Sequence, residues 1–286
     1  GATTILMPDR FEPLSVAELV TRERPTVFAG VPTAYNALLE LPGLTEAYDF
    51  RSVRLFLSAG EALPPAVLER WRGAWGADIV DGIGCTECFH IFISNRPGQV
   101  VPGCSGRPVP GIDARIVDEE GRDVAPGEIG NLLIRGGCVA SGYRNQHRLS
   151  QRTFLGEWVK TGDKFSRDEQ GMFWFAGRAD DMIKSGGIWV APIEVEATLG
   201  AHPAVLECAV VGASGPDKLV KPKAYVVLRQ GWSSSAELTR ELQQFVKGRI
   251  APYKYPRWIE YLPDLPKTAT GKIQRYKLRG STIEAT

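Results

Sequence analysis

Residues Gly177 to Glu196 read GRADDMIKSGGIWVAPIEVE and join two regions of different composition. The stretch holds an arginine, two adjacent aspartates, a lysine and a glycine pair. Alone, this pattern is typical of a surface turn followed by a helix from Pro192, because proline is favoured in the first turn of a helix and Glu194 and Glu196 suit its positive end. The flanking regions decide whether it is more than a turn.

Upstream of this stretch, amphipathic helices alternate with apolar strands. Helices are predicted at 15–23, 32–41 and 64–75, and strands at 25–31, 53–60 and 77–84. This alternation is typical of a parallel α/β sheet. From Pro102 to Phe175 the expected strands are short and separated by Gly, Pro and Asp, which predicts an antiparallel, barrel-like β subdomain.

Downstream of the stretch, the order helix, strand, strand, helix, strand predicts a small α+β domain of about 100 residues. The expected fold class is therefore α/β: residues 1–178 form part of a large domain, with the parallel sheet and the barrel-like subdomain, and residues 179–286 form the small C-terminal domain. The tail 265–280 is rich in Lys and Arg, and we expect it to be an exposed loop.

The composition bounds the class of protein. The 286 residues suffice for about two domains. With 34 basic and 33 acidic residues the net charge is +1, which gives no field to attract nucleic acid or a membrane surface. The chain shows no secretory signal and no long apolar span, and its five cysteines are an odd number. These features predict a reduced, cytoplasmic protein. The first residues read as the middle of a strand and turn, so a part of a larger protein is expected.

The stretch DGIGCTE, residues 81–87, follows a strand and places two glycines beside a hydroxyl and a carboxylate. As a dinucleotide fingerprint it is weak, because Glu87 stands where the third glycine belongs. Cys85 and Cys88, with His90 beyond them, resemble half of a zinc site, but the second half is missing. Small residues that pack a turn are the favoured interpretation.

Three polar residues elsewhere suggest anion or sugar binding. Asp163 ends the strand of WVKTGD, and Arg178 follows a turn glycine fifteen residues later. A carboxylate and a guanidinium together can grip vicinal hydroxyls or a phosphate. Lys272 lies in a basic loop, and its compact ammonium can stabilise oxyanion charge at a transition state. Capping of a turn and exposure to solvent are the simpler interpretations of Asp163 and Lys272.

Six motifs stand in the chain in a fixed order: SAGEAL, DGIGCTE, GEIGNLLIRG, WVKTGD, the opening stretch and PKTATGKIQR. Together they resemble the acyl-adenylate-forming superfamily of acyl-CoA synthetases, adenylation domains and luciferases. DGIGCTE with HIFISNRPG, and IAPYKYPR with PKTATGKIQRYKLR, look most similar to the benzoate-CoA ligase branch. The resemblance covers nearly the whole chain and implies two steps: a carboxylate attacks ATP to give acyl-AMP and pyrophosphate, and CoA then displaces AMP.

The resemblance also implies roles for individual residues. The catalytic residues would be Lys272, Thr86 and Glu87. Thr86 would contact phosphate, and Glu87 would help to hold Mg²⁺. Asp163 and Arg178 would bind the ribose of ATP or AMP. The residues that would border the adenine are Gly60, Glu61, Ala62, Asp81, Gly82 and Ile83.

The same resemblance places an acyl pocket near Ala59, Gly84, His90 and Ile91. Gly84 stands where short-chain members carry a bulky aromatic, so we expect its missing side chain to leave space for an aromatic acid. Asp180 would be the hinge about which the small domain swings between the two steps. The residues expected along the CoA tunnel are Gly187, Trp189 and Lys184.

The phosphate loop of the family, which ends in Lys, is expected upstream of Gly1. The expected function is an ATP-dependent, AMP-forming aryl-CoA ligase of the benzoate type, a cytoplasmic enzyme that uses Mg²⁺. The alternative is a truncated, non-catalytic fragment that retains AMP or CoA binding. Transfer to a carrier protein is disfavoured, because no carrier domain follows Lys272. The sequence leaves open the ring substituents, the pathway and the oligomeric state.

Overall fold

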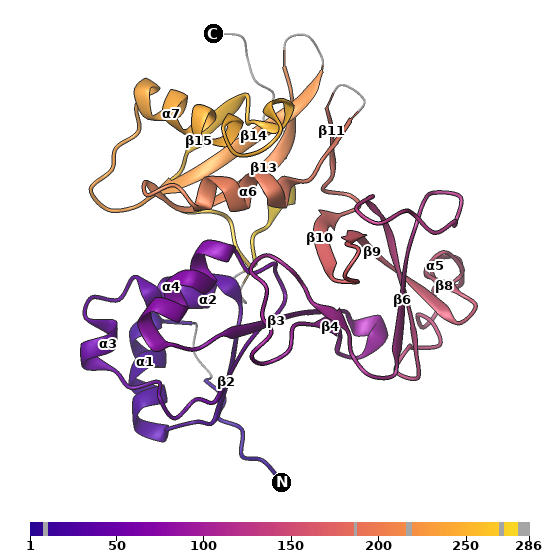
Figure 1. Cartoon of the computed structure of the whole chain (residues 1–286), viewed down its shortest axis with the longest axis horizontal. Coiled ribbons are helices and arrows are strands. Elements are labelled where there is room, and N and C mark those ends of the chain that lie inside the picture. The colour runs from indigo at the N-terminus through magenta and orange to yellow at the C-terminus, as the bar shows by residue number, and fades with distance from the viewer. Residues whose placement is uncertain (8–10, 186–187, 216–218, 269–271, 280–286) are drawn as a thin grey trace.

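The structure is a computed structural model, and it describes residues 1–7, 11–185, 188–215, 219–268 and 272–279. Figure 1 shows three units: an α/β unit at the N-terminal end, a β subdomain beside it, and an α+β unit at the C-terminal end. The predicted fold class is confirmed at this level.

The α/β unit is built on a five-stranded sheet in the order β1-β2-β3-β4-β5. β1, β2 and β3 pair in parallel, as predicted, whereas β4 and β5 continue the sheet antiparallel. The elements of this unit are α1 (Pro13–Glu23), β1 (Val27–Gly30), α2 (Pro32–Leu39), α3 (Leu44–Ala47), β2 (Leu55–Ser58), α4 (Pro65–Trp75), β3 (Ile79–Gly84), η1 (Thr86–Cys88), β4 (Ile91–Ser94) and β5 (Arg107–Pro108).

Aromatic side chains form the centre of this unit. Trp71 of α4 and Tyr35 of α2 are fully buried, and their rings meet edge to face with centroids 5.0 Å apart. Phe50 and Phe56 pack against the same indole ring. The Tyr35 hydroxyl donates a hydrogen bond to the Leu57 carbonyl oxygen at 2.8 Å, so its polar end is satisfied within the core. This packing fixes α2 and α4 on the sheet.

The β subdomain has the antiparallel order β10-β9-β7-β6, and β8 pairs with β9. Along β9 half-buried and buried residues alternate, as expected of a strand with one face in a core. Phe165 and Phe173 lie in that core. The elements are β6 (Ile112–Val117), β7 (Gly130–Gly136), α5 (His147–Thr153), β8 (Phe154–Leu155), β9 (Trp158–Arg167) and β10 (Phe173–Arg178).

The α+β unit begins within the stretch 177–196. A two-stranded hairpin, which the sequence did not predict, precedes the helix that begins at Pro192. Behind it lies the three-stranded sheet β13-β14-β15. The elements are β11 (Ile183–Ser185), β12 (Ile188–Val190), α6 (Pro192–Gly200), β13 (Val205–Ser214), β14 (Val220–Leu228), α7 (Ala236–Lys247), η2 (Pro252–Lys254), β15 (Trp258–Tyr261) and α8 (Arg275–Leu278).

The expectation of an exposed C-terminal loop was wrong. Leu265 and Leu278 are buried against β13 and β14, and the Tyr225 hydroxyl donates to the Leu278 carbonyl oxygen at 3.1 Å. The reason lies in the sheet, because β14 buries apolar side chains on both of its faces. α6 and α7 cover one face, and the tail, with the short helix α8, covers the other.

Polar contacts join the α+β unit to α2 and α4. The Asn36 side-chain amide donates to the Leu206 carbonyl oxygen at 3.2 Å. Glu40 accepts from Arg70 of its own unit at 2.7 Å and pairs with Arg229 across the boundary. These contacts fix the orientation of the two units in this structure.

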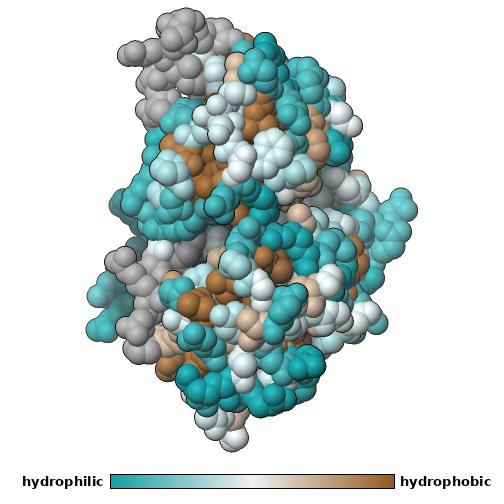
Figure 2. Space-filling model, turned by 90° about the vertical axis from the view of Figure 1, so that its left-hand side faces the viewer, coloured by the Kyte–Doolittle hydropathy of each residue, from teal (hydrophilic) through white to brown (hydrophobic). Residues whose placement is uncertain are grey.

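Two properties of the surface complete the description. In the described part of the chain, no helix is long and apolar enough to cross a membrane. On the face seen in Figure 2, apolar side chains gather in small groups separated by polar ones. That face therefore offers no broad apolar band for a partner among the described residues.

Candidate active site

The loops after β2 and β3 lie at the carboxyl ends of neighbouring parallel strands, which is the edge where α/β sheets bind ligands. Gly60, just beyond β2, has φ +91°, a conformation that glycine adopts without strain. Residues 59–62 and 84–87 thus meet at one edge. All of them except Cys85 were predicted site residues, and the fold brings them together.

Asp163 and Arg178 face each other across β9 and β10, where they are register partners. Arg178 Nη1 donates to Asp163 Oδ1 at 2.9 Å. The Asp163 side chain is only 5% exposed, whereas that of Arg178 is 53% exposed. Burial raises the pKa of the Asp163 carboxyl, and the Arg178 cation partly offsets that rise. The predicted pair is therefore assembled, with its guanidinium open to a ligand.

Thr86 and Glu87 lie in η1, directly after β3. The Tyr143 hydroxyl donates to Glu87 Oε1 at 2.5 Å and lowers the pKa of that carboxyl. The Arg178 cation lowers it further, and the Glu87 charge in turn raises the pKa of Asp163. Glu87, Asp163 and Arg178 therefore lie within electrostatic range of one another. Tyr143 was missed, because no pattern links residues 56 positions apart.

Lys272 reaches this edge from the C-terminal tail. A Cβ built on Gly60 would lie 2.9 Å from Lys272 Cε and 3.4 Å from Nζ. The Ile273 N–H donates to Glu61 Oε1 at 2.9 Å, so the backbone beside Lys272 is bound to the loop after β2. The Lys272 N–H also donates to Thr268 Oγ1 at 3.0 Å. The predicted lysine therefore lies beside the predicted adenine loop.

Asp81 is buried in β3, and burial raises the pKa of its carboxyl to about 7. Its Oδ1 atom has no hydrogen-bond partner in the described part of the chain. Gly82, its neighbour, has no room for a side chain, because a Cβ there would lie 3.2 Å from the Ile93 carbonyl oxygen. Ile83 pairs with Ile93 across the same hairpin. A buried acceptor without a partner is costly and points to a missing donor.

One reason given for the acyl pocket needs correction. A Cβ on Gly84 would lie 2.2 Å from the His90 carbonyl oxygen, so the backbone of the β3–β4 hairpin fills the space expected for a ring. Gly84 pairs with Ile91, and the exposed His90 adjoins it. These residues and Ala59 lie near the ends of β2 and β3, and their role as an acyl pocket stays a prediction.

The expected hinge and tunnel residues follow β10. Asp180 is exposed in the turn after β10. Lys184 and Trp189 are register partners in the β11–β12 hairpin, with the Lys184 ammonium 5.6 Å from the centre of the indole ring. Trp189 is 51% exposed and lines a cavity of about 150 Å³ with Met182. Gly187 lies outside the described residues.

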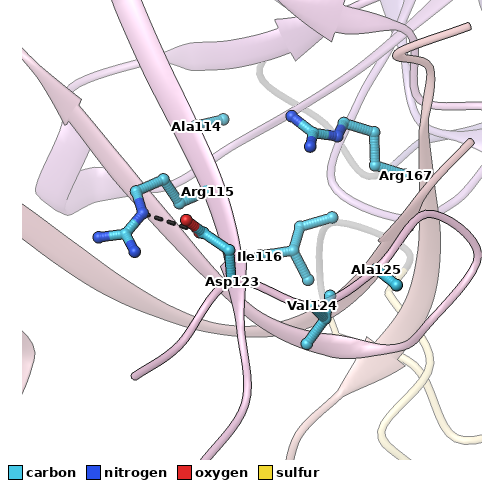
Figure 3. Close-up of a pocket in the computed structure, with 7 residues that line it drawn as sticks. All are labelled: Ala114, Arg115, Ile116, Asp123, Val124, Ala125 and Arg167. Atoms are coloured by element: carbon cyan, nitrogen blue, oxygen red, sulfur yellow. Dashed lines mark hydrogen bonds and ion pairs between the residues drawn. The ribbon is translucent and has the colours of Figure 1, made fainter. Parts of the chain in front are cut away.

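Another cavity, of about 180 Å³, opens beside β6 and contains none of the predicted site residues. In Figure 3, Arg115 and Arg167 lie on opposite sides of it. Arg115 donates to Asp123 at 2.9 Å, which neutralises one of the two cations. This cavity is separate from the candidate active site.

A protein-family model described as AMP-binding enzyme matches residues 1–144. A second model, described as AMP-binding enzyme C-terminal domain, matches residues 194–272. A benzoate–CoA ligase from Thauera aromatica is 50% identical over 98% of this chain and 53% of its own length. A 4-hydroxybenzoate–CoA/benzoate–CoA ligase from Rhodopseudomonas palustris is 47% identical over 100% of this chain and 54% of its own length.

Solved structures give the same result. The anthranilate CoA ligase AuaEII, in complex with anthranoyl-AMP, is 51% identical with a TM-score of 0.90 over 93% of this chain and 52% of its own. A benzoate CoA ligase from Burkholderia xenovorans LB400 is 48% identical with a TM-score of 0.92 over 98% of this chain and 56% of its own. The chain thus spans about half the length of the curated relatives it matches.

Proposed function

Because the chain belongs to the AMP-binding enzyme family, we propose that the protein carrying it joins an aromatic carboxylic acid to CoA through an acyl-adenylate. One observation carries the proposal: Lys272 lies against Gly60, within the same edge of the fold as the Asp163–Arg178 pair and Glu87. The relatives at 47–51% identity, named as acting on benzoates or holding anthranoyl-AMP, support an aromatic acid.

In the first step, an oxygen of the acid attacks the α-phosphorus of ATP, and the bond to pyrophosphate breaks. Negative charge builds up on the phosphate oxygens as this happens. The Lys272 ammonium stabilises that charge, because the interaction of a preorganised donor with the phosphate oxygens is stronger in the transition state than in the ground state. Its place beside Gly60 supports this role, because Gly60, Glu61 and Ala62 border the adenine in the same proposal.

Asp163 and Arg178 bind the ribose. A carboxylate accepts hydrogen bonds from both hydroxyls of a diol, and Arg178 holds it in one orientation. Asp81, Gly82 and Ile83 form the next part of the adenine site, where the unpartnered Asp81 Oδ1 is free to accept a hydrogen bond from a nucleotide amine.

Glu87 fits a magnesium ligand. A single ionised carboxylate next to substrate phosphates is how proteins commonly hold Mg²⁺, and a lowered pKa keeps Glu87 ionised. No cluster of three or more acidic, His or Cys ligands occurs in the described residues, so the phosphates would supply the remaining ligands with water. The bound ion would neutralise charge on the phosphates. Thr86 would contact the same phosphates.

The second step needs the thiol of CoA where Lys272 now lies. Residues 179–286 would form the mobile domain and residues 1–178 part of the large one, with Asp180 at the pivot. A rotation there would withdraw Lys272 and bring Gly187, Trp189 and Lys184 to the site. The exposed ring of Trp189 supports this, because exposed aromatic side chains suit a binding surface.

Pyrophosphate exchange into ATP tests the proposal. Benzoate and its ring-substituted relatives should support exchange in the longest natural protein that carries this chain, and acetate should not. Thioester formation should then follow with free CoA and fail with a carrier protein. AMP or CoA binding without exchange, for every aromatic acid tried, would show a non-catalytic protein instead.

A further inference from the structure

The motif PKTATGKIQRYKLR continues beyond Lys272, and an ion pair holds its second half. Arg275, three residues after Lys272, donates from Nε and Nη2 to both oxygens of Glu196 at 3.1 and 2.8 Å. The Glu196 side chain is 8% exposed and that of Arg275 is 23% exposed. A bidentate pair of this kind fixes direction as well as distance.

Glu196 is itself held in place. It lies on α6, and its Oε1 accepts the Val210 N–H of β13 at 2.7 Å. The carboxylate thus bridges a helix, a strand and the tail of the same unit. Because the pair is buried, loss of one partner would leave the other charge without compensation.

A different carboxylate binds the residue directly after Lys272. Glu61, in the large unit, accepts the Ile273 N–H at 2.9 Å. Arg275 lies within electrostatic range, since its cation lowers the pKa of Glu61, which burial raises. Arg279, at the end of α8, pairs with Asp181 in the turn beside the proposed pivot. The segment 272–279 is therefore bound to Glu61 on one side of the boundary, and to Glu196, Asp181 and Tyr225 on the other.

We propose that Arg275 and Glu196 are positioning residues for adenylation: their ion pair holds the backbone of 272–275 so that the Lys272 ammonium meets the phosphate. This rests on the proposed function of Lys272. In a domain rotation the Glu61 contact breaks, while the Glu196 pair moves with the small domain and carries the lysine out and back. The pair therefore acts on the first step and not on the second.

The test uses the full-length protein and two variants. Arg275→Met keeps the length of the side chain but leaves Glu196 buried without its cation. Arg275→Met combined with Glu196→Gln removes both charges, while the glutamine oxygen still accepts the Val210 N–H. Replacing both members of a buried ion pair is often neutral for stability, so the double variant should recover the melting temperature that the single variant loses.

The two half-reactions then separate positioning from stability. We expect kcat of pyrophosphate exchange to fall by roughly a hundredfold in both variants, the order of loss for a misplaced reacting group, with little change in KM for the acid. Thioester formation from supplied acyl-adenylate should stay within about threefold. Recovery of exchange together with stability, or equal damage to both steps, would overturn the proposal. Arg240→Gln, which breaks an exposed pair with Glu237 on α7, is the control.

Amide hydrogen exchange gives a readout that needs no catalysis. In the double variant, residues 272–279 should exchange faster while α7 keeps its protection. If the unmodified protein adenylates no aromatic acid, the proposed function is wrong. Amide exchange still tests whether the Arg275–Glu196 pair holds residues 272–279. Unchanged protection of 272–279 would overturn the positioning role.

Discussion

Replacement of Gly60 by alanine tests directly where Lys272 lies. The new Cβ would be 2.9 Å from Lys272 Cε and 3.4 Å from Nζ. Saturated carbons in contact prefer about 3.5–4.0 Å, so the lysine has to withdraw by about 1 Å. A displacement of that size at a reacting group costs on the order of a hundredfold in rate. We therefore expect pyrophosphate exchange with benzoate to fall by roughly this factor.

Backbone strain has to be separated from this effect. Gly60 has φ +91°, and alanine in a left-handed conformation costs about 1–2 kcal/mol. Gly231 has nearly the same φ, +90°, and nothing lies within 4 Å of its Cβ position. Gly231→Ala is thus the matched control. Both variants should lose a similar free energy of unfolding in urea, and only Gly60→Ala should lose exchange.

A double-mutant cycle decides whether the methyl group acts through the lysine. In a Lys272→Ala background, Gly60→Ala should cost less than about twofold more, because the group that it displaces is already gone. A further hundredfold loss in that background would mean that the methyl group acts on the nucleotide, and the reasoning would be refuted. Loss of exchange in Gly231→Ala would refute it as well.

Three further predictions use other parts of the site. Lys272→Ala should lower adenylation about a hundredfold or more, the scale for one preorganised donor, and spare thioester formation from supplied acyl-adenylate; equal loss of both steps would contradict the role. Folding favours the protonated form of Asp81, whose pKa burial raises from 3.8 to about 7. This contribution to the stability of the wild type is present below about pH 4 and is lost as the pH rises to 7. The stability of Asp81→Asn relative to the wild type should therefore rise over this range, by at most about 1.4 kcal/mol per pH unit in urea unfolding. A difference in stability that does not change with pH would contradict this prediction. Gly162→Ala places a Cβ 3.0 Å from Arg178 Nη2 and should weaken AMP binding, measured by calorimetry, roughly fivefold, about 1 kcal/mol. The control Gly156→Ala, at φ +67° with nothing within 4 Å of its Cβ position, should leave AMP binding unchanged. Equal weakening in both variants would show that backbone strain, and not the contact with Arg178, is the cause.

The sequence could predict those parts of the site that local pattern determines. The expected strand end at Asp163 was wrong, because β9 continues to Arg167. Arg178 ends β10, and the antiparallel register of these consecutive strands pairs it with Asp163. The loops after β2 and β3 follow from the alternation of strands and helices, because parallel neighbours bring their carboxyl ends to one edge.

Contacts between distant segments had no such signal. Ile273 and Glu61 are 212 residues apart, and Arg275 and Glu196 are 79 apart. Glu196 was explained by the positive end of a helix, but its carboxylate turns to the tail. The many basic residues of the tail predict an exposed loop. Its two leucines, Leu265 and Leu278, are buried nevertheless and fix the tail to the sheet. The family resemblance implies the proposed role of Lys272, and only the fold shows which groups hold it in place.

We propose that the protein carrying this chain adenylates an aromatic carboxylic acid. Single-turnover mass spectrometry, with the longest natural protein that carries this chain, ATP, Mg²⁺ and benzoate, tests it most directly. Benzoyl-AMP should accumulate without CoA, convert to benzoyl-CoA when CoA is added, and fail to form in Lys272→Ala. Benzoyl-CoA formed with no adenylate before it would rule out the two-step reaction, and benzoyl-AMP formed as fast in Lys272→Ala would rule out the role of Lys272.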